Sequence, residues 1–471
     1  MKKQEFRDPY LYHRGNKGYI AILFYNRIKG IKSQRCYHLT QLPYQLERID
    51  QNTDHWISQC VFFNQNRKIV SLYLIPQSFA DIDTYHSELM TGLDVDKQAD
   101  IVFDECRRLV IPPPSVIVFS GRGLQVKWFF VNPLPRRALP RWNAVQKMIC
   151  KQLAHLGADP KSRDASRVLR LENTINTKSG KKVRILYETP GERWDDPVRY
   201  DFDMFADAIL PYSMAEIKSF RQKAMEDLEK INRVKANKES CRPTSTLWQA
   251  PKRRYLKRFD AEQLQWDRFE DIRLLIRIRE WQETGTPEGF RDIFMFHAVN
   301  CLSWCIDAKK LFAEICEIGR EFAGNLTDSE IRSYSSTVLQ RSRRAAAGET
   351  ILFNGRHVDP RYRYTNQKLI DDLEITPAEE RRLHTIISVR ERKVRDVERT
   401  TKNRRAAGVI TRAEYLSQFP DKSPCLVLLK QGMSEREIAV KLGISRTTVN
   451  KFLFKVKRHM GYPLGSSDPT I

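Results

Sequence analysis

The sequence predicts a multidomain α+β protein, and three observations support this. Its 471 residues are enough for two to four domains. Over about the first 200 residues, short apolar runs of the strand type alternate with helical patterns, which indicates one α+β domain. From about residue 260 to residue 345 the periodicity is helical throughout, without a strand signal. We therefore expect an α+β domain followed by a helical domain.

Seven runs rich in β-branched and aromatic residues are predicted strands. They cover residues 18–25, 61–63, 68–74, 78–83, 115–120, 126–131 and 183–187. Gly121 and Gly123 separate the fifth and sixth runs, so these two can form a hairpin. Residues 139–157 are a predicted helix, because Trp142, Val145 and Ile149 recur on one side of it.

Helices and a linker are expected after this domain. Residues 214–240 are a predicted charged helix, and the polar stretch 241–248 around Pro243 is the linker candidate. Thr327 is the expected N-cap of a later helix. The expected organisation is an α+β domain over 1–212 with its motifs within 60–190, a charged helix and linker over 213–258, a helical domain over 259–350, a charged helical connector over 351–410, a C-terminal domain over 411–462 and a tail over 463–471.

Charge and composition narrow the classes of function. Lys and Arg number 81 against 58 Asp and Glu, a net charge of +23, and residues 381–460 hold 20 of the basic and 7 of the acidic residues. Such a surplus favours a polyanionic partner, usually nucleic acid. No apolar run approaches 18 residues and the N-terminus is charged, so we expect a cytoplasmic protein without a membrane partner. The nine cysteines include no Cys-x-x-Cys pair, which argues against disulfides and structural zinc.

Two carboxylates stand at the end of one predicted strand. Asp81 and Asp83 are two residues apart, a spacing that points both side chains to the same face of a strand. Carboxylates placed in this way repel each other unless a cation lies between them, and Mg²⁺ or Mn²⁺ suits oxygen ligands. The pair predicts a metal site, although two surface aspartates on a loop would give the same pattern.

A basic glycine turn follows, in the segment Ser120-Gly-Arg-Gly-Leu-Gln-Val-Lys-Trp128. Glycines permit a tight turn and the close approach of a ligand to the backbone. Arg122 and Lys127 supply cationic donors for phosphate, and Gln125 alternates with Lys127 on one face of the strand. An ordinary basic hairpin is the other interpretation of this segment.

A third cluster of charged residues lies between residues 157 and 178. It contains two carboxylates, Asp159 and Asp164, and then Arg163, Arg167 and Arg170, and it ends with Asn176 and Lys178. Carboxylates beside arginines suit a metal site next to a triphosphate or a template. They suit a network of surface ion pairs equally well.

Taken together, the three segments resemble the catalytic core of the archaeo-eukaryotic primase superfamily, in the form found in plasmid and phage replication proteins. The segments that carry the resemblance are Ala80–Tyr85, Ser120–Gln125 and Asp164–Lys178, within about residues 60–190. The resemblance implies an RRM-like core, in which an antiparallel sheet is packed with helices. It also implies metal-dependent nucleotidyl transfer, that is, primer synthesis with Mg²⁺ or Mn²⁺ as cofactor.

The resemblance assigns roles to individual residues. Asp81, Asp83 and Asp164 would be the catalytic metal ligands, with Asp159 as an alternative third carboxylate. The expected nucleotide-binding residues are Ser120, Arg122, Gly123, Gln125, Lys127, Arg167, Arg170 and Lys178. The family often has a histidine where this sequence has Gln125. That departure keeps a second interpretation open, a non-catalytic origin-binding initiator or regulator with a degenerate primase-like core.

The segment Leu428–Lys455 resembles a helix-turn-helix of the LuxR or sigma-factor type. Ser434 and Glu437 form a predicted capping box, Gly443 makes the turn, and Ile444 is expected to fill the angle between the helices. Ile438, Ala439, Leu442, Val449 and Leu453 are the expected core. The residues left for DNA are Ser445, Arg446, Thr447, Thr448, Asn450 and Lys451 in the major groove, with Lys455, Lys457 and Arg458 on phosphates. A helical pair that contacts protein is the alternative, and residues 366–387 are a weaker second candidate that could be a helical hairpin.

These expectations define one function. The sequence predicts a plasmid replication protein that synthesises primers and binds origin DNA through its C-terminal helix-turn-helix. Its expected partners are origin DNA, single-stranded template, nucleoside triphosphates and a separate helicase. The helicase is expected to be separate because the chain has no Gly-x-x-x-x-Gly-Lys-Ser/Thr phosphate loop.

Overall fold

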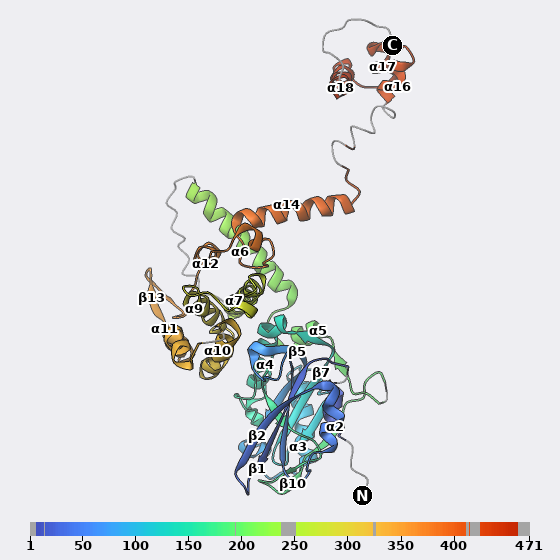
Figure 1. The fold of residues 1–471 in the computed structure, drawn as a ribbon. Coiled ribbons are helices and arrows are strands. Elements are labelled where there is room, and N and C mark those ends of the chain that lie inside the picture. The colour runs from blue at the N-terminus through green and yellow to red at the C-terminus, as the bar shows by residue number, and fades with distance from the viewer. Residues whose placement is uncertain are drawn as a thin grey trace. The chain divides into compact units, whose positions relative to one another are not determined.

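The computed structural model describes residues 6–13, 15–193, 195–236, 251–323, 326–410, 414 and 424–459. The chain forms two compact units, residues 1–387 and residues 388–471 (Figure 1). The expected linker 241–248 and the expected tail 463–471 lie outside the described residues. Among the helices of the described segments, none combines the length and the apolar character that a membrane span needs.

A ten-stranded sheet forms the centre of the first unit, which confirms the expected α+β class with a mainly antiparallel sheet. The strand order is β11-β6-β7-β5-β4-β1-β3-β8, with β2 added beside β1 and β12 added parallel beside β7. The strands are β1 Tyr19–Asn26, β2 Ile31–His38, β3 Asp54–Ser58, β4 Val61–Phe62, β5 Leu72–Ile82, β6 Val116–Phe119, β7 Leu124–Pro135, β8 Val168–Arg170, β11 Arg184–Glu188 and β12 Arg199–Tyr200. A small separate ladder joins β9 Ile175–Asn176 to β10 Lys181–Lys182.

The observed strands differ from the predicted ones at β5, and several observed strands, β2 and β3 among them, were not predicted. The strand expected over 68–74 begins only at Leu72, because Ile69–Ser71 form a 3₁₀ turn, η2, and β5 then continues without a break through Ile82. Strand β2 was not predicted, because Ile31–Arg35 are exposed and lack the alternation of a half-buried strand. The expected helix 139–157 is present as α4 Leu139–Gln152 followed by a short turn, Ala154–Leu156.

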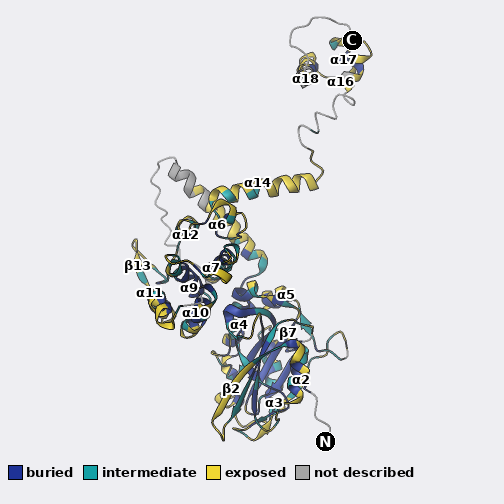
Figure 2. Cartoon of the chain, in the orientation of Figure 1, coloured by how far each residue is buried: buried dark blue, intermediate teal, exposed yellow. Residues whose placement is uncertain are grey.

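Helices cover both faces of the sheet (Figure 2). Because successive side chains in a strand point to opposite faces, Ile117 and Trp128 belong to a different cluster from Val118 and Phe129. The first cluster is buried under α3 Val95–Arg108, α4 and α5 Phe202–Ile209. The second is covered by the short helix α1 Asp8–His13 through Tyr12.

A buried ion pair fastens α1 to the sheet. The Nζ atom of Lys127 lies 2.5 Å from Oδ2 of Asp8, and both side chains are completely buried. The ammonium also lies 4.9 Å from the centre of the Tyr12 ring. Charges removed from water in this way are tolerated only as a pair, so each depends on the other for its place in the core.

The helical region packs against the sheet domain within the same unit. It consists of α6 Met214–Ala236, α7 Pro251–Ile278, α8 Trp281–Thr284, α9 Arg291–Leu302, α10 Ala308–Ala323 and α11 Asp328–Ala346. The expected N-cap Thr327 is confirmed, in a capping box with Glu330. A hairpin of β13 Ile351–Phe353 and β14 Arg356–Val358 follows, where sequence patterns predicted only helices.

Two side chains of this helical region hold the turn that precedes β5. The carboxylate of Glu314 on α10 accepts a hydrogen bond from the Val70 N–H at 3.1 Å. The guanidinium of Arg273 on α7 donates to the Val70 carbonyl at 2.8 Å and is paired with Glu321. Both backbone groups of Val70 are therefore bound by the helical region.

Residues 366–387 belong to the helical region and are not a free helix-turn-helix. They form α12 Asn366–Asp372 and α13 Pro377–Glu380, and their apolar residues Leu373 and Ile386 are fully buried. The carboxylate of Asp271 on α7 accepts the N–H groups of His384, Thr385 and Ile386. Of the two earlier alternatives, these contacts favour the helical hairpin.

The second unit contains α14 Val389–Ala406, α16 Pro424–Lys430, α17 Glu435–Leu442 and α18 Arg446–His459. The predicted capping box of Ser434 and the left-handed turn at Gly443, with φ of +62°, are confirmed. Ile438 and Val449 are fully buried, as expected. Ile444 is 37% exposed, so the expectation that it fills the angle between the helices is wrong.

The buried pair makes a stability prediction. Replacing Asp8 by alanine should lower the free energy of unfolding by about 3–5 kcal/mol, because the Lys127 ammonium stays buried without a counter-charge. The double variant Asp8→Leu/Lys127→Met should recover most of that loss, and Asp104→Ala at an exposed ion pair should leave the midpoint unchanged. Urea unfolding followed by tryptophan fluorescence measures all three. Equal midpoints for Asp8→Ala and the parent protein would contradict the prediction.

Candidate active site

Asp81 and Asp83 lie at the end of β5. Along this part of β5, strand β4 no longer pairs with one edge. Strand β4 pairs with β5 only at Leu72 and Leu74. Farther along, the side chain of Gln146 on α4 takes the neighbour's place. It accepts from the Phe79 N–H at 3.2 Å and donates to the Phe79 carbonyl at 3.0 Å. Both backbone groups of Phe79 on this edge are thereby hydrogen-bonded.

A loop segment continues this edge pairing. The Asp83 N–H donates to the Gly157 carbonyl at 2.9 Å, and the Asp159 N–H donates to the Asp81 carbonyl at 2.8 Å. Gly157 has φ of +91°, and a Cβ there would lie 2.6 Å from the Asp83 carbonyl oxygen. Glycine is thus required both for the backbone conformation and for the close approach. The pairing places Asp159 beside Asp81.

Arg167 joins these two carboxylates. Its Nη2 atom lies 3.0 Å from Oδ2 of Asp81 and 3.3 Å from Oδ2 of Asp159, and all three side chains are between a fifth and a third exposed. Burial raises the pKa of Asp81; Arg167 opposes this rise, and the negative charges of Asp83 and Asp159 add to it. Three acidic groups therefore influence one another here.

Asp164 is held elsewhere. Its carboxylate lies 2.5 Å from the ammonium of Lys310 on α10 and accepts hydrogen bonds from the N–H and the hydroxyl of Ser166. Burial alone would raise the pKa of Asp164, but Lys310 and the Ser166 hydrogen bonds outweigh burial and leave the pKa below its ordinary value. The geometry favours Asp159 over Asp164 as the third carboxylate of the group.

The carboxylate oxygens of this group are chemically suitable ligands for a hard divalent cation. Asp81 and Asp159 present carboxylate oxygens to one shared cationic group, and Asp83 lies close enough for its charge to raise the pKa of Asp81. Oxygen ligands of this kind fit Mg²⁺ or Mn²⁺. In the described segments no three His, Cys, Asp or Glu residues converge on one point as metal ligands would. The guanidinium of Arg167 is the cation that the structure places between the carboxylates.

The glycine turn lies against the end of β5. The Ser120 N–H donates to the Gly123 carbonyl at 2.9 Å, and the Thr84 hydroxyl donates to the Arg122 carbonyl at 3.2 Å. A Cβ at Gly123 would meet the Ile82 carbonyl oxygen at 2.2 Å, so only glycine allows this contact. Arg122 is exposed, with its guanidinium 4.1 Å from the centre of the Tyr85 ring, and is free to meet an anion.

Two residues that were predicted to bind nucleotide, and that follow this turn in the chain, are buried. Lys127 is enclosed with Asp8, so the expectation that it binds the triphosphate is wrong. Gln125 pairs with Asp81 across β5 and β7 but is only 1% exposed, and its Oε1 atom has no hydrogen-bond partner among the described residues. Periodicity placed both on one strand face, but it could not show that α1 covers that face at Lys127.

Arg170 and Lys178 differ in whether their charges are available to bind a phosphate. Arg170 is 12% exposed and donates to Oδ1 of Asp54 at 2.6 Å, so its charge is already neutralised by a carboxylate and the expected phosphate contact is not supported. Asp54 is fully buried and also binds Arg27 at 2.7 Å. Sequence reasoning missed Asp54, because nothing near it in the chain marks it as a partner of residues over 100 positions away. Lys178 is exposed.

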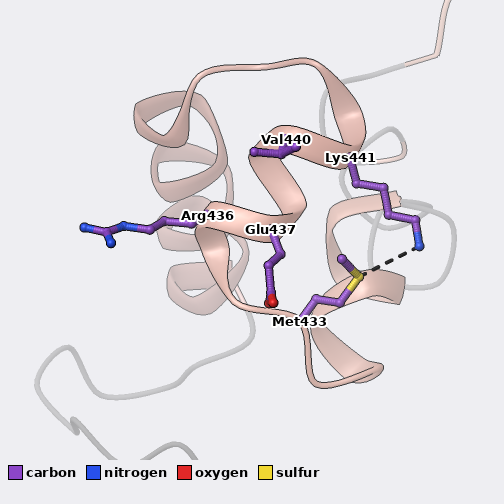
Figure 3. A pocket seen from close by; sticks show the side chains of 5 residues that line it. All are labelled: Met433, Arg436, Glu437, Val440 and Lys441. Carbon is purple, nitrogen blue, oxygen red and sulfur yellow. Dashed lines mark hydrogen bonds between the residues drawn. The ribbon is translucent and has the colours of Figure 1, made fainter.

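In the second unit, the predicted DNA-binding residues lie on or next to α18. Ser445 caps this helix, since its Oγ accepts the Thr448 N–H at 3.1 Å. Arg446, Thr447, Thr448, Asn450 and Lys451 are exposed. The side chains of Lys455, Lys457 and Arg458 lie outside the described residues. A separate open hollow of about 510 Å³ lies on α17, and it is lined by Met433, Arg436, Glu437, Val440 and Lys441 (Figure 3).

Gly157 carries a prediction about the site. Replacing Gly157 by alanine should cost more unfolding free energy than the matched change Gly180→Ala, by about 1 kcal/mol or more. Both glycines have positive φ, which costs alanine about 1–2 kcal/mol, but a Cβ at Gly180 meets nothing within 4 Å. Urea unfolding of the two variants gives the difference. Equal losses would show that the Asp83 carbonyl does not press on residue 157.

Comparison with known proteins gives one clear sequence relative. No family model matches the chain. A curated protein of Clostridium perfringens named "Replication protein" is 27% identical over 382 residues, which are 80% of this chain and 77% of the relative.

Three solved structures are also similar. The primase-polymerase (AEP) domain of cyanophage S-2L has 17% identity and a TM-score of 0.32, covering 44% of this chain and all of that domain. The catalytic domain of primase RepB′ with initiator DNA has 14% identity and a TM-score of 0.25, covering 46% and 90%. Primase RepB′ itself has 14% identity and a TM-score of 0.26, covering 70% and 94%. Over most of its length, the chain is thus similar in sequence to a replication protein.

Proposed function

We propose that this protein is a replication primase of a plasmid, which joins nucleotides in a metal-dependent reaction. The observation that carries the proposal is the backbone pairing of the segment around Asp81 and Asp83 with Gly157 and Asp159 at the end of β5, beside the glycine turn that carries Arg122. The three carboxylates come from segments up to 78 residues apart, and backbone pairing brings these segments together. The likeness to a replication protein supports the same conclusion.

The residues divide into two roles. Asp81, Asp83 and Asp159 hold Mg²⁺ or Mn²⁺, which when bound activates a hydroxyl nucleophile and neutralises charge on the phosphate. Arg122 and Lys178 are exposed cations, and they bind phosphates of the incoming nucleotide or the template. The Ser120–Gly123 hydrogen bonds hold the turn, and the Arg122 guanidinium lies over the Tyr85 ring.

The exposed residues of α18 suit a second role for the chain, the binding of origin DNA. Arg446 and Asn450 are one helical turn apart, so both can reach base edges from the same side of the helix. The second unit would then place the protein on its origin, and a separate helicase would open the duplex.

Gln125 favours one alternative function. It stands at the position where the resembled family often has a histidine, and it is buried opposite Asp81. A chain without a side chain that contacts nucleotide at this position could be a non-catalytic origin-binding initiator or regulator. Synthesis of product separates the two functions.

Primer synthesis tests the catalytic proposal. The full chain should make labelled dinucleotides on single-stranded DNA with Mg²⁺ or Mn²⁺, and Asp81→Asn/Asp83→Asn should lower synthesis by at least 1,000-fold, because the cation loses its charged ligands. The control Asp96→Asn/Asp100→Asn removes two exposed carboxylates of α3 and should keep full activity. Equal synthesis by the two double variants would refute the catalytic role, and no synthesis by the parent protein would favour the initiator.

DNA binding is tested on α18. Arg446→Ala should weaken binding to the protein's own replicon DNA by about 10- to 100-fold, the usual cost of a lost base contact. Arg436→Ala removes an equal charge from the exposed hollow on α17 and should change binding little. Footprinting and binding isotherms at several salt concentrations measure both. Equal effects of the two changes would assign α18 to another partner.

A further inference from the structure

The guanidinium of Arg167 lies between the carboxylates of Asp81 and Asp159. A divalent cation shared by two carboxylates lies between their oxygens, and Nη2 of Arg167 lies there, 3.0 Å from Asp81 and 3.3 Å from Asp159. A guanidinium neutralises the mutual repulsion of the two acids in the same way that a metal does. The two cations exclude each other, because they need the same oxygens and carry the same sign of charge.

The backbone of Arg167 makes two hydrogen bonds, while its guanidinium contacts the carboxylates through one nitrogen only. Its N–H donates to the Asp164 carbonyl at 3.0 Å, and its carbonyl accepts the Gln59 N–H at 3.1 Å, directly before β8. Its guanidinium makes single contacts through Nη2, and the buried Nε atom has no partner among the described residues. A fork–fork arrangement would use two nitrogens on one carboxylate and bind more tightly. The backbone hydrogen bonds that precede β8 therefore do not involve the guanidinium.

The same arginine is close to where phosphates would be. Asp81 and Asp83 lie beside the turn that carries Arg122, so an anion on a bound cation would lie next to the displaced guanidinium. The planar guanidinium of arginine matches the geometry of phosphate as well as that of carboxylate. When the Arg167 guanidinium is displaced from the two carboxylates, it can therefore bind a phosphate instead.

We propose that Arg167 is an exchangeable cation. It bridges Asp81 and Asp159 while the metal is absent, gives way when Mg²⁺ or Mn²⁺ binds, and then holds a phosphate of the incoming nucleotide. This inference rests on the proposed function for its metal and nucleotide. Metal binding must then displace Arg167, so the arginine lowers metal affinity, and removing it raises that affinity.

Mn²⁺ binding to the full chain, followed by electron paramagnetic resonance of free Mn²⁺, tests the exchange. Arg167→Gln should bind Mn²⁺ at least tenfold more tightly than the parent protein. The control Arg163→Gln removes an exposed charge from the same loop, four residues away, and should change the affinity less than threefold. Asp81→Asn/Asp83→Asn gives the background from other sites, and melting curves without metal confirm that each variant is folded.

The second half of the exchange has its own measurement. With saturating Mn²⁺, Arg167→Gln should bind a non-hydrolysable nucleoside triphosphate at least tenfold more weakly than Arg163→Gln does. Equal triphosphate affinities would overturn the capture of phosphate. Equal Mn²⁺ affinities of Arg167→Gln and the parent protein would overturn the displacement, and primer synthesis by the parent protein would still support the proposed function.

Two further outcomes would also decide the matter. If only Arg167→Gln binds Mn²⁺, the arginine is a permanent replacement for the metal, which overturns the exchange and favours the non-catalytic initiator. If neither binds Mn²⁺ above the background, both the exchange and the metal-dependent function fail.

Discussion

The site depends on the way the chain completes the open edge of β5. Beyond Leu74 no strand of the described part of the chain pairs with this edge, and backbone groups left unpaired in a core are costly. Gln146 supplies one pair of hydrogen bonds, and the segment from Gly157 to Asp159 supplies the next. The hydrogen bonds between this segment and β5 pair the backbone groups of the strand and also place a third carboxylate, Asp159, beside Asp81. The same contact therefore contributes to the sheet and to the cluster of acidic residues.

That concentration of acids has a further physical requirement. Carboxylates that share a partly buried place raise one another's pKa and resist ionisation unless a cation is present. The chain meets this requirement in two ways, with Arg167 for Asp81 and Asp159 and with Lys310 for Asp164. Lys310 comes from the helical region, so the charge balance near the site involves both parts of the first unit. Asp164 is thereby drawn away from the other acids.

The sequence predicted what local pattern determines. Strand β5 with its two carboxylates, the β6–β7 hairpin around Gly123, helix α4 and the capping box at Ser434 all follow from spacing within a few residues. Each of these elements is recognisable because its signal and its cause lie in the same short segment.

The features that the sequence could not predict depend on contacts between residues that are far apart in the chain. Lys127 was expected to bind phosphate, and its burial follows from Asp8, 119 residues earlier in a segment without a clear pattern. The choice between Asp159 and Asp164 likewise depends on pairing with β5, which no local spacing encodes. Ile444 is exposed because α17 and α18 pack through Ile438 and Val449 without it.

The hydrogen bonds between the helical region and Val70 affect the order in which the protein folds during synthesis. Its partners Glu314 and Arg273 lie 244 and 203 residues farther along the chain. A ribosome releases the sheet domain first, so the turn that leads into β5 emerges with both backbone groups of Val70 still bound to water. The nascent domain can collapse early, yet this turn reaches its final hydrogen bonding only after residue 314 has left the exit tunnel. Completion of the hydrogen bonding at the start of β5 is in this sense a late event of translation.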